Sequence, residues 1–432
     1  AIVGGGFTGL WTARELLRRD PHLTVCVLER SVCGFGASGR NGGWASALYP
    51  LSDGAVVARH GREALTNLRA HLRRSVVALG ESLRDDGIDA HYLRGGTLVF
   101  ARSELQARRL QRSVVAAREL GDGPEHLDWL APEEANERGV LTHSYGATYT
   151  PHCARVHPAR LVRGLADVVE RLGGQIFENT RVARIRGVRR GRPAEVVTEN
   201  ASVHARVVVR ATEGFTPTLP GERRTLAPIY SLMIATEPQT DAFWDEVGFS
   251  GCETFADDRH LIIYGQRTKD GRIAFGGRGA PYHFGSTVEE RFDESPKVFA
   301  LLEATVRELF PSLEGEMTHR WGGPLAMARD QSPSVVVDYA SGLASAGGYT
   351  GDGVVMSYVA ANALADLIID PDAATAAGGL PFVQHENKRW EFEPLRWLGI
   401  NAGLGAANWA DRVEARRQHE SRAGRWLERF FD

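Results

Sequence analysis

The apolar positions at the start of the chain follow two different periods. Residues 1–3 form a short apolar run, and between Leu10 and Leu17 the apolar side chains recur at helical spacing. A second apolar run occupies residues 24–28 and is followed at once by Glu29. This order predicts a strand, a helix and a second strand that pack together as one βαβ unit.

The same two periods divide the rest of the chain into elements. Helical spacing predicts helices at residues 55–86, 104–120, 157–172, 296–310 and 354–369, a short helix from Pro132, and a tail that is helical from Ala407 onward. Alternating or β-branched runs predict strands at residues 92–101, 145–150, 175–178, 180–185, 205–212, 229–237 and 343–346, and hairpins at residues 195–204 and 261–277.

The order of these elements predicts an α/β fold in which two domains alternate along the chain. A Rossmann-like domain is expected from residues 1–54, 151–222 and 319–371. An α+β domain with an antiparallel sheet is expected from residues 55–150 and 223–318, with residues 372–432 as a C-terminal helical cap. Such alternation places a cleft between the domains, and ligand sites favour clefts of this kind.

Three glycines lie between the first predicted strand and its helix. Gly4, Gly6 and Gly9 have the spacing Gly-x-Gly-x-x-Gly. The first allows a tight turn, the second lets the backbone approach a pyrophosphate, and the third lets helix and strand pack closely. Glu29 ends the second strand, where an acid accepts hydrogen bonds from ribose hydroxyls. The unit therefore predicts a dinucleotide site, because strand, helix, second strand and acid all occur in the required order.

A loop of small residues follows the second strand. Residues 33–44 read Cys-Gly-Phe-Gly-Ala-Ser-Gly-Arg-Asn-Gly-Gly-Trp, with Arg40 and Asn41 as the charged and amide members. A nicotinamide-binding domain needs no such loop at this place, whereas a chain that wraps the second half of a longer cofactor does. The loop therefore favours a cofactor that extends beyond the βαβ unit.

These two motifs carry a resemblance to a known family. Gly-Gly-Gly-Phe-Thr-Gly-Leu at residues 4–10 and Ala-Ser-Gly-Arg-Asn-Gly-Gly at residues 37–43 resemble the D-amino-acid oxidase superfamily of FAD-dependent oxidoreductases. The second motif is most similar to that of the γ-glutamylputrescine oxidoreductase branch. The resemblance continues to about residue 370 and implies FAD as the cofactor and the C–N bond of an amine as the point of attack.

The resemblance also implies which segments meet the cofactor. It places the backbone at Val182 beside the adenine, Ala211 and Thr212 close to the cofactor, and residues 348–353 under the isoalloxazine. Glu213 stands where the family often has Asn, which leaves its role open. Motifs and resemblance together predict FAD contacts at Gly4, Gly6, Phe7, Thr8, Gly9, Glu29, Arg30, Ser38, Gly39, Arg40, Asn41, Gly42, Gly43, Trp44, Val182, Ala211, Thr212, Gly348, Tyr349, Thr350, Gly351, Asp352, Gly353 and Val354.

Four residues are candidates for contact with the substrate. Tyr264 and Arg278 lie on hairpin strands that face the flavin in the family, although alternate strand residues point away. Trp321 is a candidate aromatic wall, with core packing as the equal alternative. Asp352, where the family often has His, either attracts a cationic amine or only complements a helix N-terminus.

Two further departures from sarcosine-oxidase-type relatives bear on the chemistry. A Lys that assists the reaction with oxygen in those enzymes would fall near Ala274, and no Lys is present there. Those relatives attach the flavin through a Cys before the final strand, whereas residues 320–325 contain none. The sequence therefore predicts non-covalent FAD and leaves open whether O2 or another acceptor takes the electrons.

Composition excludes several other classes of protein. The net charge of −3 over 432 residues gives no electrostatic reason to bind nucleic acid or an anionic membrane. The four cysteines have no metal-type spacing and are too few for a disulfide scaffold, which favours a reducing cytoplasm. No apolar run approaches the length of a membrane span.

Three functions remain in competition. The leading interpretation is an FAD-dependent enzyme that oxidises an amine or amino-acid-like substrate to an imine. An NAD(P)H-dependent flavin monooxygenase is an alternative, but such enzymes usually carry Gly-Asp-Ala after a strand, whereas residues 351–353 read Gly-Asp-Gly. The third is a non-catalytic flavoprotein subunit, in which the tail with Trp390, Trp397, Trp409 and Trp426 serves assembly, including that of identical copies.

Overall fold

The computed structural model describes residues 1–189, 191–279, 281–371 and 379–424. Its helices are α1 (Phe7–Arg19), α2 (Ala37–Arg40), α3 (Asp53–Asp85), α4 (Glu104–Glu119), α5 (Pro132–Arg138), α6 (Pro158–Arg171), α7 (Asp241–Val247), α8 (Pro296–Leu309), α9 (Gly353–Ile369) and α10 (Leu395–Arg417), with short 3-10 turns at Glu213–Thr218, Phe284–Ser286 and Glu290–Asp293.

The strands are β1 (Ile2–Val3), β2 (Cys26–Leu28), β3 (Trp44–Ser46), β4 (Thr97–Phe100), β5 (Asp128–Leu130), β6 (Ala147–Thr150), β7 (Cys153–Arg155), β8 (Gln175–Phe177), β9 (Val182–Arg186), β10 (Ala194–Thr198), β11 (Ser202–Ala205), β12 (Val208–Arg210), β13 (Ala227–Thr236), β14 (Thr254–Asp257), β15 (Ile263–Arg267), β16 (Ile273–Arg278), β17 (Met317–Met327), β18 (Ser334–Asp338) and β19 (Leu343–Gly347).

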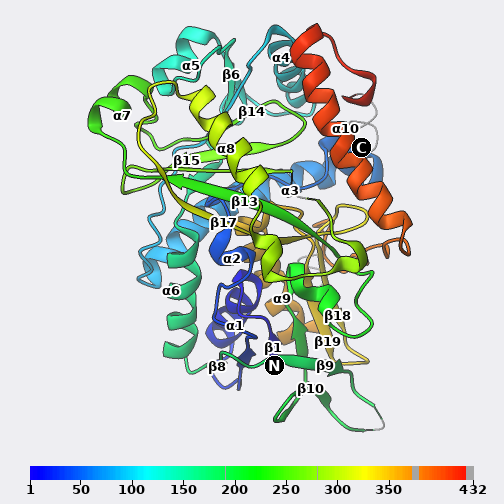
Figure 1. The fold of residues 1–432 in the computed structure, drawn as a ribbon. Helices are drawn as coiled ribbons and strands as arrows, with labels where there is room; N and C mark the ends of the chain where they lie inside the picture. Colours follow the sequence, from blue (N-terminus) through cyan, green and yellow to red (C-terminus); the bar gives the residue numbers. More distant parts are fainter. Residues whose placement is uncertain (190, 280, 372–378, 425–432) are drawn as a thin grey trace.

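The first large sheet has the strand order β18-β19-β12-β1-β2-β8. Its pairs are parallel except for β18 with β19. Helix α9 packs against α1, α3 and strands β18 and β19, and its side chains are apolar on nearly every face because it is enclosed in this way. Figure 1 shows this sheet in the lower part of the molecule, with the N-terminus at its centre. The predicted Rossmann-like unit is therefore confirmed.

The second large sheet has eight strands in the order β17-β13-β16-β15-β14-β4-β6-β5. Phe249, Phe255, Phe275 and Phe310 form an aromatic core on one of its faces. The prediction of an antiparallel sheet is wrong at one pair, because β14 and β4 run parallel. These two strands are far apart in the sequence, so no tight turn between them imposes antiparallel pairing.

Sheet membership places two segments differently from the predicted domain boundaries. Strand β17 begins at Met317 and pairs with β13 along its length, so residues 319–327 belong to the second sheet. Helix α3 supplies Leu65, Leu72 and Leu79 to the core beneath the first sheet. Long-range packing decides both placements, and the order of elements along the chain does not reveal it.

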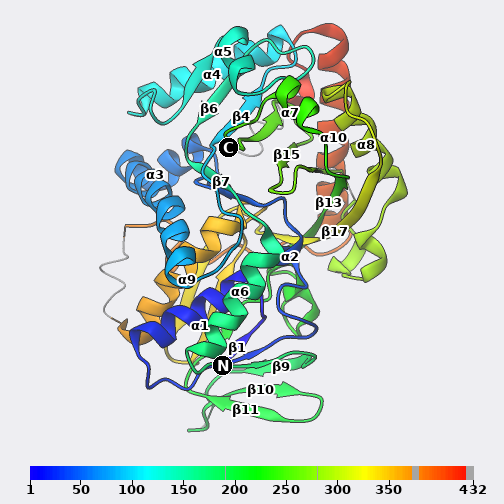
Figure 2. The same ribbon diagram turned by 90° about the vertical axis from the view of Figure 1, so that its left-hand side faces the viewer.

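The C-terminal helix α10 begins earlier than the sequence suggests. It starts at Leu395 and not at Ala407, although three glycines weaken the helix propensity of this segment. Hydrogen bonds of Arg396 to the Arg223 carbonyl and of Asn401 to the Tyr282 carbonyl hold its first turns. The carboxylate of Asp411 accepts the backbone N–H groups of His260 and Leu261 at 2.8 and 2.9 Å. Glu414 pairs with Arg109 of α4, and Figure 2 shows α10 along the side of the upper half.

None of the helices among the described residues is long and apolar enough to cross a lipid bilayer. Trp426 of the predicted tail lies outside the described residues.

Candidate functional site

The turn between β1 and α1 can be built only from small residues. Gly4 has φ +113°, and a Cβ there would overlap the carbonyl oxygen of Ala211. A Cβ on Gly9 would overlap the carbonyl oxygen of Gly4. The helix therefore starts directly over the strand end, with Gly6 as its N-cap, and its free N–H groups lie where phosphate groups are bound in such units.

Glu29 holds the adjoining strand end against this turn. Its two carboxylate oxygens accept the backbone N–H groups of Gly5 at 2.8 Å and of Ser31 at 2.9 Å. Each oxygen keeps a second lone pair for a further donor. The geometry fits an acid that binds ribose hydroxyls, which remains a prediction for this residue.

The small-residue loop is fixed by its own side chains. Ser38 Oγ accepts the Phe7 N–H at 2.8 Å. Asn41 Nδ2 donates to the carbonyls of Ala37 and Ser38, and its Oδ1 accepts the Gly43 N–H at 2.8 Å. Asn41 thus caps the C-terminal end of the short helix α2. The sequence predicted a cofactor contact for this residue but did not reveal this structural role.

Arg40 connects this loop to the second sheet. Its Nη1 donates to Asp293 Oδ2 at 2.6 Å and to the Gly322 carbonyl at 2.7 Å. In the described chain its Nη2 is buried without a hydrogen-bond partner. Arg40 therefore holds two domains together at the edge of the site and keeps one donor for a ligand.

A cleft of about 360 Å³ lies between the loops of the first sheet and the face of the second. Most of the predicted loop residues line it: Phe7, Thr8, Ser38, Arg40, Asn41, Gly42, Trp44, Tyr264, Tyr349, Thr350, Gly351, Asp352, Gly353 and Val354. Sequence reasoning missed further lining residues, among them Glu213, Ser231, Ile262, Leu325 and Ser357. Ser231 and Leu325 reach the cleft through the register of β13 and β17, for which no local signal exists, and the other three through the packing of elements that are distant in the sequence.

Tyr264 stands in the wall of this cleft. Its hydroxyl lies 2.7 Å from Ser231 Oγ, and its ring meets Trp44 edge-on at 6.1 Å between centroids. A Cβ on Gly42 would lie 2.5 Å from the tyrosine ring, so the loop needs glycine there to let the ring pack against it. The structure thus places Tyr264 beside the predicted cofactor loop.

Asp352 is the N-cap residue of α9 and also lines the cleft. Its side chain makes no capping hydrogen bond to the helix. A carboxylate at this place can still complement the positive end of the helix by its charge, so both alternatives for Asp352 stay predictions.

The other two substrate candidates are placed differently. Trp321 does not line the cleft but a second cavity, and its Nε1 donates to the Arg40 carbonyl at 2.9 Å. The structure thus places Trp321 beside the cofactor loop but outside the cleft, and a contact with the substrate stays a prediction. The side chain of Arg278 lies outside the described part, and only its pairing with Ser231 in β16 and β13 is seen.

Glu213 is a buried acid that sequence reasoning left without a role. Its Oε1 accepts the N–H groups of Gly348 at 2.9 Å and Tyr349 at 3.3 Å, while Oε2 is buried without a partner in the described chain. Burial raises the pKa of this carboxyl to about 7, against the backbone hydrogen bonds that favour the charged form. Glu213 therefore fixes the loop that was predicted to pass under the flavin.

The remaining predicted contacts surround the ends of the central strands. Val182 packs in a hydrophobic cluster beside β1 and β2, Thr212 Oγ1 lies 2.8 Å from Thr216 Oγ1, and the Arg30 guanidinium lies 4.7 Å from the Phe215 ring centroid. Gly39 donates its N–H to Gly34, and Gly43 adopts φ +71°. Their contacts with a cofactor remain predictions.

The residues present fit a long cofactor with a dinucleotide end. A glycine turn and an acid lie at one end, and the cleft lies at the other. In the cleft, three buried polar atoms have no hydrogen-bond partner among the described residues: Arg40 Nη2, Trp44 Nε1 and Glu213 Oε2. Buried polar groups are costly unless they are hydrogen-bonded, so these atoms suit the polar edges of a ring system. The fit supports FAD.

Comparisons with known proteins agree with this geometry. Residues 1–367 match the model of the family described as FAD dependent oxidoreductase (DAO). A probable oxidoreductase OrdL of Rhizobium meliloti is 27% identical over 374 residues, which cover 85% of this chain and 82% of that protein. A gamma-glutamylputrescine oxidoreductase of Escherichia coli is 27% identical over 405 residues, covering 92% and 90%.

The fold also matches solved structures. The crystal structure of glycine oxidase from Geobacillus kaustophilus superposes with a TM-score of 0.71 at 23% identity, over 85% of this chain and 94% of that one. The family model covers most of the chain, and both ends of the cofactor site are in place. The protein therefore belongs to the DAO family of FAD-dependent oxidoreductases, and FAD is its cofactor.

Proposed function

We propose that the protein oxidises the C–N bond of an amine or amino-acid-like substrate to an imine. The observation that carries the proposal is that Asp352 and Tyr264 line the same cleft as the FAD-binding loops. A carboxylate in such a cleft attracts the cationic amino group of a substrate. The proposal is supported by relatives whose names refer to gamma-glutamylputrescine and to glycine.

The residues of the chain have separable tasks in this proposal. Bound FAD supplies the acceptor for the hydride that leaves the carbon next to nitrogen. Asp352 attracts the ammonium end of the substrate to the start of α9 through a charge-assisted hydrogen bond, which contributes about 1.5–3 kcal/mol. Its carboxylate then accepts the ammonium proton, so that the amine is neutral when the hydride leaves. The Tyr264 and Ser231 hydroxyls orient the polar part of the substrate, and Trp44 packs on the other side of the Tyr264 ring.

The N-terminus of α9 places positive potential in the cleft, where negative charge develops when the flavin is reduced. This helix of 17 residues opens directly into the cleft at Gly353, with no acidic residue in its first turn. The positive end of a helix dipole stabilises negative charge that develops nearby. The negative charge of Asp352 opposes this stabilisation. The site therefore balances attraction of the cationic substrate against stabilisation of negative charge on the reduced flavin.

The electron acceptor and the cellular setting belong to the same proposal. O2 or another acceptor completes the cycle, and Ala274 near the position of the oxygen-assisting Lys favours a dehydrogenase over a fast oxidase.

A cytoplasmic location is favoured by four free cysteines. An assembly of identical chains is proposed through the tail, whose Trp397 and Trp409 are exposed.

An anaerobic reduction screen tests the proposal. FAD-loaded protein is mixed without oxygen with a panel of primary and secondary amines and amino acids, and the flavin absorbance is followed. Bleaching by an amine is expected, and NADPH alone should leave the spectrum unchanged. Reduction by NADPH and by no amine would support the monooxygenase alternative, and reduction by neither would support the non-catalytic subunit.

A further inference from the structure

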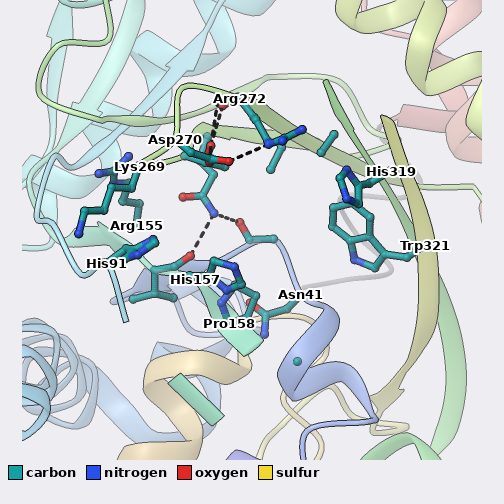
Figure 3. Close-up of a pocket in the computed structure, with 17 residues that line it drawn as sticks. Asn41, His91, Arg155, His157, Pro158, Lys269, Asp270, Arg272, His319 and Trp321 are labelled. Atoms are coloured by element: carbon teal, nitrogen blue, oxygen red, sulfur yellow. Dashed lines mark hydrogen bonds and ion pairs between the residues drawn. The ribbon is translucent and has the colours of Figure 1, made fainter. Parts of the chain in front are cut away.

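A second cavity, of about 380 Å³, shares a wall with the FAD cleft. Asn41 and Gly42 line both spaces, so this segment separates them. Figure 3 shows Arg155, Lys269 and His91 on one side of the second cavity and His319 and Trp321 on the opposite side. Nothing in the proposed amine oxidation uses this cavity.

The deepest charge in this cavity belongs to Arg155. The residue ends β7 and is 8% exposed. Its Nη1 donates to the Arg267 carbonyl at 2.7 Å, whereas its Nε is buried without a partner in the described chain. Among the described residues no carboxylate forms an ion pair with Arg155. Burial lowers the pKa of its guanidinium, since a buried charge without a counter-charge is costly.

The acidic groups nearby are already engaged. Asp270 accepts hydrogen bonds from Arg272 Nε at 2.7 Å and Thr268 Oγ1 at 2.6 Å. Lys269, at the more exposed side, has Asp89 as its nearest carboxylate at 3.8 Å. Asp89 is itself exposed and also pairs with Arg160 at 3.2 Å. In the described part of the chain, the lining therefore carries three positive side chains, Arg155, Lys269 and Arg272, against the single carboxylate of Asp270.

Neighbouring elements add to the positive potential. Helix α6, 14 residues long, starts at the cavity with His157 as N-cap and Pro158 as its first residue. The positive end of its dipole is directed to this place. The Gln266 side-chain amide donates to the carbonyls of Gly42 at 2.7 Å and Val156 at 3.3 Å. Because these donors are already used, a ligand would be held mainly by the cationic side chains.

We propose that this cavity binds the oxoanionic group, carboxylate or phosphate, of a small molecule that is distinct from the amine substrate. Arg155 holds the anion at the buried end and Lys269 closes on it from the exposed side. The volume is that of a small-molecule site. The proposal does not depend on the amine chemistry of the neighbouring cleft.

Binding is tested on the FAD-loaded protein with two simple probes. Inorganic phosphate and, in a separate arm, acetate are titrated by calorimetry and by thermal melting, against potassium chloride at equal ionic strength. A saturable heat and a matching rise in Tm are expected for at least one probe, because a ligand that binds only the folded state stabilises it by mass action. The arm that saturates identifies phosphate or carboxylate as the preferred group.

Variants connect the signal to the cavity. Arg155→Gln should abolish saturation, and Lys269→Gln should weaken the apparent affinity by at least about threefold. Lys297→Gln, an exposed residue of α8 with the same change of charge, is the matched control and should bind like wild type. Flavin content and Tm report whether each variant folds. If Arg155→Gln does not fold, the affinity of Lys269→Gln alone tests whether the cavity binds the anion. No saturation in wild type, or saturation that survives the cavity substitutions, would overturn the proposal.

Discussion

Replacement of Glu213 by glutamine isolates the effect of one buried carboxyl on the FAD loop. The amide oxygen of glutamine can accept the same N–H groups of Gly348 and Tyr349 that Glu213 Oε1 accepts now. The amide NH2 would take the place of Oε2, which is buried without a partner among the described residues. The cost of an unsatisfied buried polar group is therefore the same for the variant and for the protonated acid. The substitution therefore removes titration and keeps the geometry.

The magnitude follows from the difference between folded and unfolded pKa values. The Glu213 pKa is about 7 in the folded protein against 4.5 for an unperturbed glutamate, with burial as the main cause. Between these two values the folded state binds a proton that the unfolded state has lost. The free energy of unfolding therefore falls as the pH rises from about 4.5 to about 7, by up to about 3 kcal/mol from this group.

Thermal melting of wild type and Glu213→Gln between pH 4.5 and pH 8 is the assay, on FAD-free and FAD-loaded protein. We expect similar Tm values at the acid end and a higher Tm for the variant at the alkaline end. FAD content checks that the loop is intact. Parallel Tm curves for the two proteins across the whole range would refute the argument, because they would show that Glu213 is ionised at little cost.

Three other predictions concern the cofactor and the substrate. Acid precipitation should leave all yellow colour in the supernatant, since residues 320–325 offer no Cys for attachment, and colour in the pellet would contradict this. Glu29→Ala should weaken FAD binding by about 1–3 kcal/mol in a fluorescence titration, and an unchanged Kd would show that Glu29 does not reach the ribose. Asp352→Asn should keep FAD content but lower kcat/KM for an amine by at least about tenfold, or 1.4 kcal/mol, whereas wild-type efficiency would leave Asp352 a helix-end residue only.

The cofactor end of the site could be predicted because its parts are close in the sequence. Gly4, Gly9 and Glu29 lie within one βαβ unit, and the turn that joins β1 to α1 excludes a Cβ at both glycines. The glycine spacing and the acid are local signals, although the carbonyl that excludes a Cβ at Gly4 belongs to Ala211, far away in the sequence. The interleaved arrangement of two domains followed in the same way from the order of the elements.

The substrate side was decided by tertiary structure. The positions of Trp321 and Ser231 depend on which strands become neighbours and on their register, because a shift of one residue moves a strand's side chains to the other face. Glu213 lies in a 3-10 turn and reaches the cleft through its hydrogen bonds to the loop at Gly348 and Tyr349. The parallel pairing of β4 with β14 and the early start of α10 have the same origin, since contacts between distant segments outweigh local propensity. The sequence by itself determined the fold class and a dinucleotide site, because local backbone geometry carries them, and its motifs implied FAD through the family resemblance. Only the tertiary structure decided which side chains face the cleft and that a positively charged cavity lies behind it.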